Sequence, residues 1–266
     1  MLYLNSSRIS RKDLDNKVRD FLGKGMCFDL DGIIIDVKQN TKTDYFDWTW
    51  NAMERAAGFY KDKEHERVKW RWVSLYAKTE KTHEEELELA ELQKVLDASW
   101  QGKYFDEVTK DLFPVPWMKN FEKFMERIRK FNVKDERKIK LGIVSAAPEP
   151  YIRKVAELAG LDIDRSFIRG CYTGIDETGR MTGEFSSIKT STRKELILGF
   201  CCYNGLSLGE LMYHDDHISG IDSLGLAGFS VAVRPELNEK GERLRRMAHV
   251  TLTDGNWLEH PILNVI

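Results

Sequence analysis

Two short apolar runs have the pattern of strands that are buried on both faces. Residues 26–31 read M-C-F-D-L-D and residues 140–146 read K-L-G-I-V-S-A, and each run ends in polar side chains. Longer segments place apolar residues at the three- to four-residue spacing of helices. Buried strands that alternate with helices are typical of parallel sheets. The pattern predicts an α/β fold with a parallel sheet as its core.

Residues 41–132 interrupt this pattern. Glycine and proline are rare there, and aromatic and charged residues alternate at helical spacing. We expect an inserted all-helical subdomain over residues 41–132 and a core built from residues 1–40 and 133–266. Six of the seven tryptophans lie in the insertion. They are interpreted either as the core of a small subdomain or, for Trp48 and Trp50, as the lining of a substrate pocket.

Short sequence patterns predict the positions of several helices and strands. Thr82 and Glu85 form a capping box, which predicts a helix after them. Residues 168–175 and 180–185 read as the two strands of a β-hairpin. Another helix should follow Pro116, with four apolar residues on its buried face. These four are Phe121, Phe124, Met125 and Ile128.

The composition limits the choice of partners. The formal net charge is -2 over 266 residues, which favours neither nucleic acid nor a membrane surface. No run approaches the roughly 18 apolar residues that a membrane span needs, and the first residues lack the apolar segment of a signal peptide. We therefore expect a cytoplasmic protein. The four cysteines show no Cys-x-x-Cys spacing, so we expect reduced, buried thiols and assign them no chemistry.

The first candidate for chemistry is a pair of carboxylates. Asp29 and Asp31 stand at the carboxyl end of the first predicted strand, and Gly32 follows them. The two-residue period of a strand sends both carboxylates to one face. Like charges this close are costly unless a cation lies between them or one carboxyl holds a proton. In an open α/β sheet ligands bind beyond the carboxyl ends of the strands, so the pair marks a candidate site.

Residues 29–33 read D-L-D-G-I and resemble the first motif of the haloacid dehalogenase superfamily, Asp-x-Asp-Gly-Thr, with Ile33 in place of threonine. The resemblance implies that Asp29 is a nucleophile that becomes an aspartyl-phosphate and that Asp31 is the general acid and base. It also implies a bound Mg²⁺ and a role for Gly32 in phosphate binding. The haloacid-cleaving members lack an acid at the position of Asp31, so dehalogenation is not expected.

Later motifs of the superfamily have counterparts in the right order. Ser145 ends the second predicted strand and matches the phosphate-binding hydroxyl of motif two. Lys194 is our choice for the phosphate-binding lysine of motif three, with Lys189 as the alternative. The dipeptide Thr182-Gly183 is similar to one in the phosphoserine-phosphatase-like branch. The resemblance therefore points to that branch. It also implies a Rossmann-like core whose active site is covered by the inserted helices, which form a helical cap over residues 41–132.

Motif four departs from the pattern of the branch, which is a Gly-Asp pair followed four residues later by a second aspartate. Alignment places Asp216 at the aspartate of the pair, Asp215 at its glycine and Gly220 at the second aspartate. The resemblance implies Mg²⁺ ligands from Asp216 and from the two aspartates of motif one. We expect Asp215 to supply the missing acid as a further ligand, with Asp222 as the alternative. The flanking histidines are not expected to be ligands, because Mg²⁺ prefers oxygen.

Together the motifs predict a Mg²⁺-dependent phosphatase that hydrolyses a small phosphorylated metabolite. The alternative is a non-catalytic protein of the same fold that binds a phosphorylated ligand or acts as a scaffold. Ile33, Gly220 and His214 support that alternative, because each departs from the motifs. Phosphoserine phosphatases carry a glutamate near the position that Lys38 occupies here. A lysine there favours a substrate with a second negative group, such as a sugar phosphate acid or a nucleotide.

Overall fold

The computed structural model describes residues 2–5, 7–37, 49–76, 78, 80–162, 166–186 and 190–266. The chain divides into two compact units. Unit 1 consists of Met1–Phe46, Val115–Gly170 and Ile188–Ile266, and unit 2 consists of Asp47–Pro114 and Cys171–Ser187. The strand order is β1-β8-β7-β6-β2-β3-β4-β5, and helices connect most of the strands. The α/β class predicted from the sequence is therefore confirmed.

Unit 1 is built on a mostly parallel sheet. β2 pairs in parallel with both β3 and β6, β6 with β7, and β7 with β8, whereas the edge strand β1 runs antiparallel to β8. The bounds are β1 Leu2–Leu4, β2 Gly25–Phe28, β3 Lys140–Pro148, β6 Leu211–Asp215, β7 Phe229–Val233 and β8 Val250–Leu252. Both apolar runs seen in the sequence are strands, but the first strand ends at Phe28, just before its aspartates.

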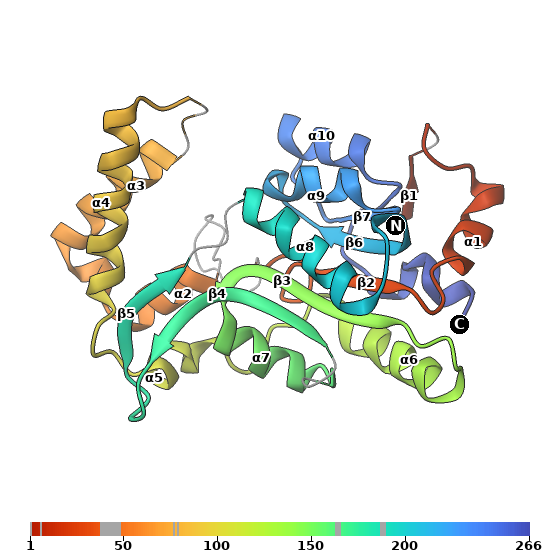
Figure 1. Ribbon diagram of the computed structural model, residues 1–266, viewed down its shortest axis with the longest axis horizontal. Coiled ribbons are helices and arrows are strands. Elements are labelled where there is room, and N and C mark those ends of the chain that lie inside the picture. Colours follow the sequence, from red (N-terminus) through yellow and green to blue (C-terminus); the bar gives the residue numbers. More distant parts are fainter. Residues whose placement is uncertain are drawn as a thin grey trace. The chain divides into compact units, whose positions relative to one another are not determined.

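Helices lie on both faces of this sheet, with α8, α9 and α10 on one side and α6 and α7 on the other (Figure 1). Every residue of the central strands β2, β6 and β7 is buried as a result. The bounds are α1 Arg11–Arg19, α6 Phe121–Lys134, α7 Glu149–Leu158, α8 Thr190–Asn204, α9 Ile221–Leu226 and α10 Glu239–Met247. Short 3₁₀ turns occupy Leu208–Glu210, Ile218–Gly220, Trp257–Glu259 and Pro261–Asn264.

The helix predicted after Pro116 is α6, and its four expected apolar residues are all buried. Phe121 and Phe124 contact both Phe28 of β2 and Trp257 near the carboxyl terminus, with ring centroids 4.7–6.5 Å apart. This aromatic cluster packs α6 into unit 1. The range expected for the cap, 41–132, therefore extends beyond the inserted part of unit 2.

Unit 2 contains the inserted helices and a β-hairpin. The regular elements described in the insertion are helices, together with 3₁₀ turns at Phe59–Lys61 and Lys110–Leu112. The helices are α2 Thr49–Ala56, α3 Lys63–Tyr76, α4 His83–Ser99 and α5 Phe105–Thr109. The predicted capping box is present at the start of α4, since Thr82 and Glu85 each accept a hydrogen bond from the other's backbone N–H. The predicted hairpin is also confirmed: β4 (Phe167–Ile175), which begins in unit 1, pairs antiparallel with β5 (Met181–Ser186). A role for unit 2 as a cap stays a prediction.

Trp50 belongs to an aromatic cluster inside unit 2. Its ring lies 5.8 Å from that of Trp100 and 5.6 Å from that of Phe185, measured between centroids. The other two residues singled out for substrate specificity, Trp48 and Lys38, lie outside the described residues. Among the helices that the structure describes, none has the length and apolar character to cross a membrane. The cytoplasmic location stays a prediction.

Candidate active site

The polar residues of motifs one, two and four lie at the carboxyl ends of three neighbouring strands. Phe28 of β2 is level with Ile143 of β3 and His214 of β6, and the Asp29 N–H donates to the carbonyl oxygen of His214 at 3.2 Å. Asp29, Ser145 and Asp215 therefore all lie at this edge of the sheet. This is the place where open α/β sheets bind ligands.

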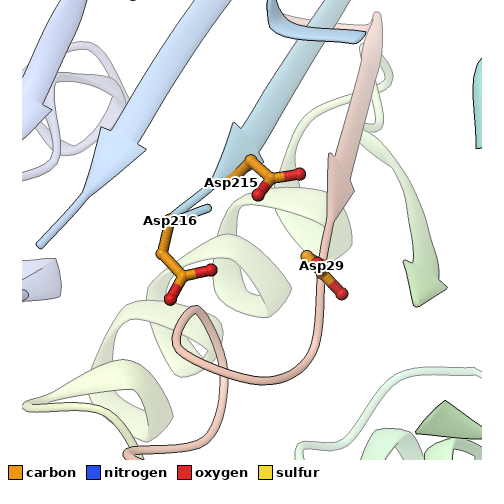
Figure 2. Close-up of side chains that lie close together, drawn as sticks. All are labelled: Asp29, Asp215 and Asp216. Carbon is orange, nitrogen blue, oxygen red and sulfur yellow. The ribbon is translucent and has the colours of Figure 1, made fainter. Parts of the chain in front are cut away.

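Three carboxylates gather at this edge (Figure 2). One carboxylate oxygen from each of Asp29, Asp215 and Asp216 lies within 4.8 Å of the others. Asp29 follows β2, and the other two come from the end of β6. Two segments separated by almost 190 residues in sequence are brought together because β2 and β6 are adjacent in the sheet.

Protonation at this cluster is strongly perturbed. Burial, together with the charges of Asp215, Asp29 and Asp31, raises the pKa of Asp216 well above its usual range. Burial raises the pKa of Asp215 to about 6, although Arg193 opposes the shift. Three carboxyl groups this close together retain protons unless a divalent cation offsets their charge. A set of donors made of oxygens fits Mg²⁺.

The turn after β2 shapes the space around Asp216. Gly32 has φ +77°, which favours glycine, and a Cβ atom there would lie 1.9 Å from Asp216 Oδ2. The N–H of Gly32 donates to the carbonyl oxygen of Ile35 at 2.9 Å, which closes the turn. Besides burial, the charge of Asp31 raises the pKa of both Asp216 and Tyr151. The turn thus brings Asp31 near the Asp216 carboxylate.

Ser145 is buried in β3, next to β2. Its hydroxyl oxygen accepts a hydrogen bond from the Ala147 N–H at 3.3 Å. Helix α7 begins at Glu149, four residues further on. Ser145 does not end its strand as expected, because β3 continues to Pro148, but it lies two residues past Ile143, the residue level with Phe28 at the end of β2. Its role in phosphate binding stays a prediction.

Arg193 is a site residue that the sequence analysis missed. It lies in the first turn of α8 and is only 5% exposed. Its Nη1 lies 3.1 Å from Asp29 Oδ2 and 2.9 Å from Asp215 Oδ2. Burial alone would lower the pKa of Arg193, but the charges of Asp29, Tyr213 and Asp215 raise it well above its usual range. Arg193 is therefore a buried cation that bridges motifs one and four.

Lys194, the choice from sequence, lies elsewhere. Its Nζ is 2.9 Å from Asp222 Oδ2, and the side chains are 39% and 52% exposed. The structure therefore brings neither Lys194 nor Asp222 into the carboxylate cluster. Lys189 lies outside the described residues. Helical spacing could have favoured the neighbouring arginine, because Arg193 shares a face of α8 with the buried Ile197 and Phe200, at positions i+4 and i+7.

The two histidines of motif four do not join the cluster. His214 is fully buried, its Nδ1 lies 3.0 Å from the Cys27 carbonyl oxygen, and its Nε2 lies 3.0 Å from His260 Nε2. Burial lowers the pKa of His214 to about 3, so the imidazole is neutral at pH 7. The ring of His217 pairs with the Ser219 hydroxyl at 3.0 Å. Neither imidazole belongs to the group of carboxylates around Asp29, and the flanking role of both histidines stays a prediction.

Solved structures share this architecture at low sequence identity. A phosphoserine phosphatase in apo form is 15% identical, with a TM-score of 0.62 over 91% of this chain and 98% of that chain. A phospho-aspartyl intermediate analogue of phosphoserine phosphatase is 16% identical, with a TM-score of 0.61 over 91% and 98% of the two chains. A cytosolic 5′-nucleotidase IIIB bound to cytidine is 10% identical, with a TM-score of 0.63 over 99% and 93%. No family model and no curated protein matches the sequence. The chain has the haloacid dehalogenase-like fold that its motifs imply.

Proposed function

We propose that this protein is a Mg²⁺-dependent phosphatase that hydrolyses a small phosphomonoester through an aspartyl-phosphate on Asp29. The observation that carries the proposal is the meeting of Asp29, Asp216 and Arg193 at the carboxyl edge of the sheet. A nucleophilic carboxylate, oxygen donors for a metal and a buried cation are the groups that transfer of a phosphoryl group to an aspartate requires.

In the proposed reaction, an Asp29 carboxylate oxygen attacks phosphorus while the ester oxygen leaves in line. Asp31 protonates the leaving oxygen and then removes a proton from the water that hydrolyses the aspartyl-phosphate. Release of inorganic phosphate regenerates the Asp29 carboxylate. The Ser145 hydroxyl donates to the transferred group, whereas the Gly32 N–H, expected from the motif to bind phosphate, already donates to the Ile35 carbonyl oxygen.

Arg193 takes the role that the sequence analysis gave to Lys194 or Lys189. A guanidinium offers several N–H donors in one plane, so Arg193 can contact both Asp29 and an oxygen of the phosphoryl group. The Asp29 and Asp216 carboxylates and the Asp31 backbone carbonyl would hold Mg²⁺. The ion supplies positive charge that allows a carboxylate to approach a phosphate dianion.

The proposal is tested by release of inorganic phosphate from a panel of esters: phosphoserine, nucleoside 5′-monophosphates, a phosphorylated sugar acid and p-nitrophenyl phosphate. Each is assayed with Mg²⁺ and with chelator. We expect metal-dependent turnover that Asp29→Asn abolishes and that Asp222→Asn, the matched control outside the cluster, retains. A folded protein that binds Mg²⁺ but releases no phosphate from any ester would contradict the proposal and favour the non-catalytic alternative.

The panel also tests the substrate class. Phosphoserine phosphatases and a 5′-nucleotidase share this fold, and the lysine at position 38 favours a substrate with a second negative group. We therefore propose a phosphorylated sugar acid or a nucleoside monophosphate rather than phosphoserine. Preference for phosphoserine, or unchanged specificity in Lys38→Ala, would contradict this choice.

A further inference from the structure

Asp215 is held by three donors. Its Oδ2 accepts from Arg193 Nη1 at 2.9 Å and from the Tyr213 hydroxyl at 2.9 Å, and its Oδ1 accepts from the His217 N–H at 3.0 Å. Tyr213 and Asp215 are two residues apart on β6 and are both fully buried. The period of a strand puts their side chains on the same face. The Tyr213 hydroxyl thus fixes the carboxylate oxygen that also holds Arg193.

The glycine at position 220 leaves room for the Asp215 carboxylate. The backbone of Gly220 has φ -90°, which any residue can adopt, so conformational freedom does not require a glycine. A Cβ atom at position 220, however, would lie 1.8 Å from Asp215 Oδ2 and 2.1 Å from Asp215 Cγ. The Asp215 carboxylate therefore fills the volume that a side chain at position 220 would need. The acid at 215 and the glycine at 220 are complementary.

We propose that Tyr213 is a positioning residue, whose hydroxyl holds the Asp215 carboxylate in the volume left by Gly220 so that the carboxylate fixes Arg193 against Asp29. The inference rests on the proposed function, because its kinetic consequence is the placement of Arg193 beside the nucleophile. Each step of the chain from Tyr213 to Asp29 is a contact of 2.9–3.1 Å between buried side chains. Tyr213 itself touches no reacting atom.

The test is a double-mutant cycle, with p-nitrophenyl phosphate and Mg²⁺ as the probe. Tyr213→Phe removes only the hydroxyl, and we expect it to lower kcat about tenfold while KM stays within about twofold, since one hydrogen bond to a charged group is lost. In an Asp215→Gly background the same change should lower kcat less than about twofold, because no carboxylate is left to hold. Tyr203→Phe, on an exposed tyrosine of α8, is the matched control and should change neither constant.

A second pair of variants is used in case Asp215→Gly alone does not fold. The exchange variant, Asp215→Gly with Gly220→Asp, refills the volume, whereas Gly220→Asp alone introduces the 1.8 Å clash. We expect Gly220→Asp alone to lower Tm and the exchange variant to recover part of that loss. An equal effect of Tyr213→Phe on kcat with and without Asp215 would overturn the inference. So would a lower Tm for Tyr213→Phe at unchanged kcat, because that result indicates a structural role only.

A readout without turnover separates this inference from the proposed function. Hydrogen exchange of the Arg193 guanidinium, followed by ¹⁵N NMR and identified by its loss in Arg193→Lys, reports how firmly the group is held. We expect exchange to become about tenfold faster in Tyr213→Phe, as the hydrogen-bonded chain loosens. If the native protein releases no phosphate but the exchange accelerates, the proposed function fails and the positioning by Tyr213 stands. Unchanged exchange would overturn the positioning even in an active enzyme.

Discussion

Arg193 and Lys194 are adjacent basic residues, but replacing each of them with methionine should have very different consequences. Arg193→Met removes the cation that lies 3.1 Å from Asp29 Oδ2 and 2.9 Å from Asp215 Oδ2. Lys194→Met removes a cation whose partner is the half-exposed Asp222. Methionine keeps much of the aliphatic length of both side chains, so each variant reports mainly the loss of charge and hydrogen bonding.

The expected magnitudes follow from burial. Breaking a buried ion pair by removing one partner costs about 3–5 kcal/mol, because the remaining charge is left uncompensated. The Arg193 side chain is 7% exposed, and its carboxylate partners are 9% and 0% exposed, so this range applies. An exposed pair such as Lys194 with Asp222 contributes about 0–1 kcal/mol. Loss of one preorganised electrostatic contact at a reacting group lowers kcat by about 10²–10³, and that loss is expected for Arg193→Met alone.

Urea unfolding of both variants, followed by circular dichroism, gives the change in the free energy of unfolding. Phosphate release from the best ester of the panel gives kcat and KM. Arg193→Lys, which keeps the charge but not the planar donors, should fall between the native protein and Arg193→Met. The reasoning is refuted if Lys194→Met loses activity while Arg193→Met is as stable and as active as the native protein.

Three further outcomes are expected. Gly32→Ala should lower the affinity for Mg²⁺, measured by calorimetry, because a Cβ atom would meet the Asp216 carboxylate at 1.9 Å. Trp257→Phe should lower the free energy of unfolding by about 2–3 kcal/mol in urea titrations, because it opens a cavity and removes the 3.0 Å hydrogen bond from the indole N–H to the Ile33 carbonyl oxygen. Burial raises the pKa of Asp215 to about 6, so the metal-free protein should lose stability as pH rises from about 4 to about 6. In thermal unfolding, Mg²⁺ should therefore raise Tm more at pH 7.5 than at pH 5, where protons compete with the metal.

Much of the site could be read from the sequence, because its signals are local. An apolar run followed at once by Asp29 and Asp31 identifies a buried strand with acids at its end. Asp215 and Asp216 repeat this arrangement at the end of β6. Parallel strands present their carboxyl ends at one edge, so acids that end such strands converge once the strands are neighbours.

Which of the basic residues is buried beside Asp29 could not be predicted from such local signals. Arg193 and Lys194 are adjacent in sequence, and the order of the motifs did not separate them. The rotation of α8 about its own axis decides which one faces the sheet, and that rotation is set by the packing of Ile197 and Phe200 in the core. The helical spacing of these residues favours Arg193, whereas the resemblance to a lysine motif favours Lys194.

The sequence by itself determined the α/β class, the strand ends that carry Asp29 and Asp216, and the capping box of α4, because each depends on residues close together along the chain. Only the tertiary structure decided that Arg193 bridges motifs one and four and that the Asp215 carboxylate fills the volume beside Gly220. Both depend on distances between side chains of different elements. Such distances follow from how helices and turns pack on the sheet, which no local pattern of residues records.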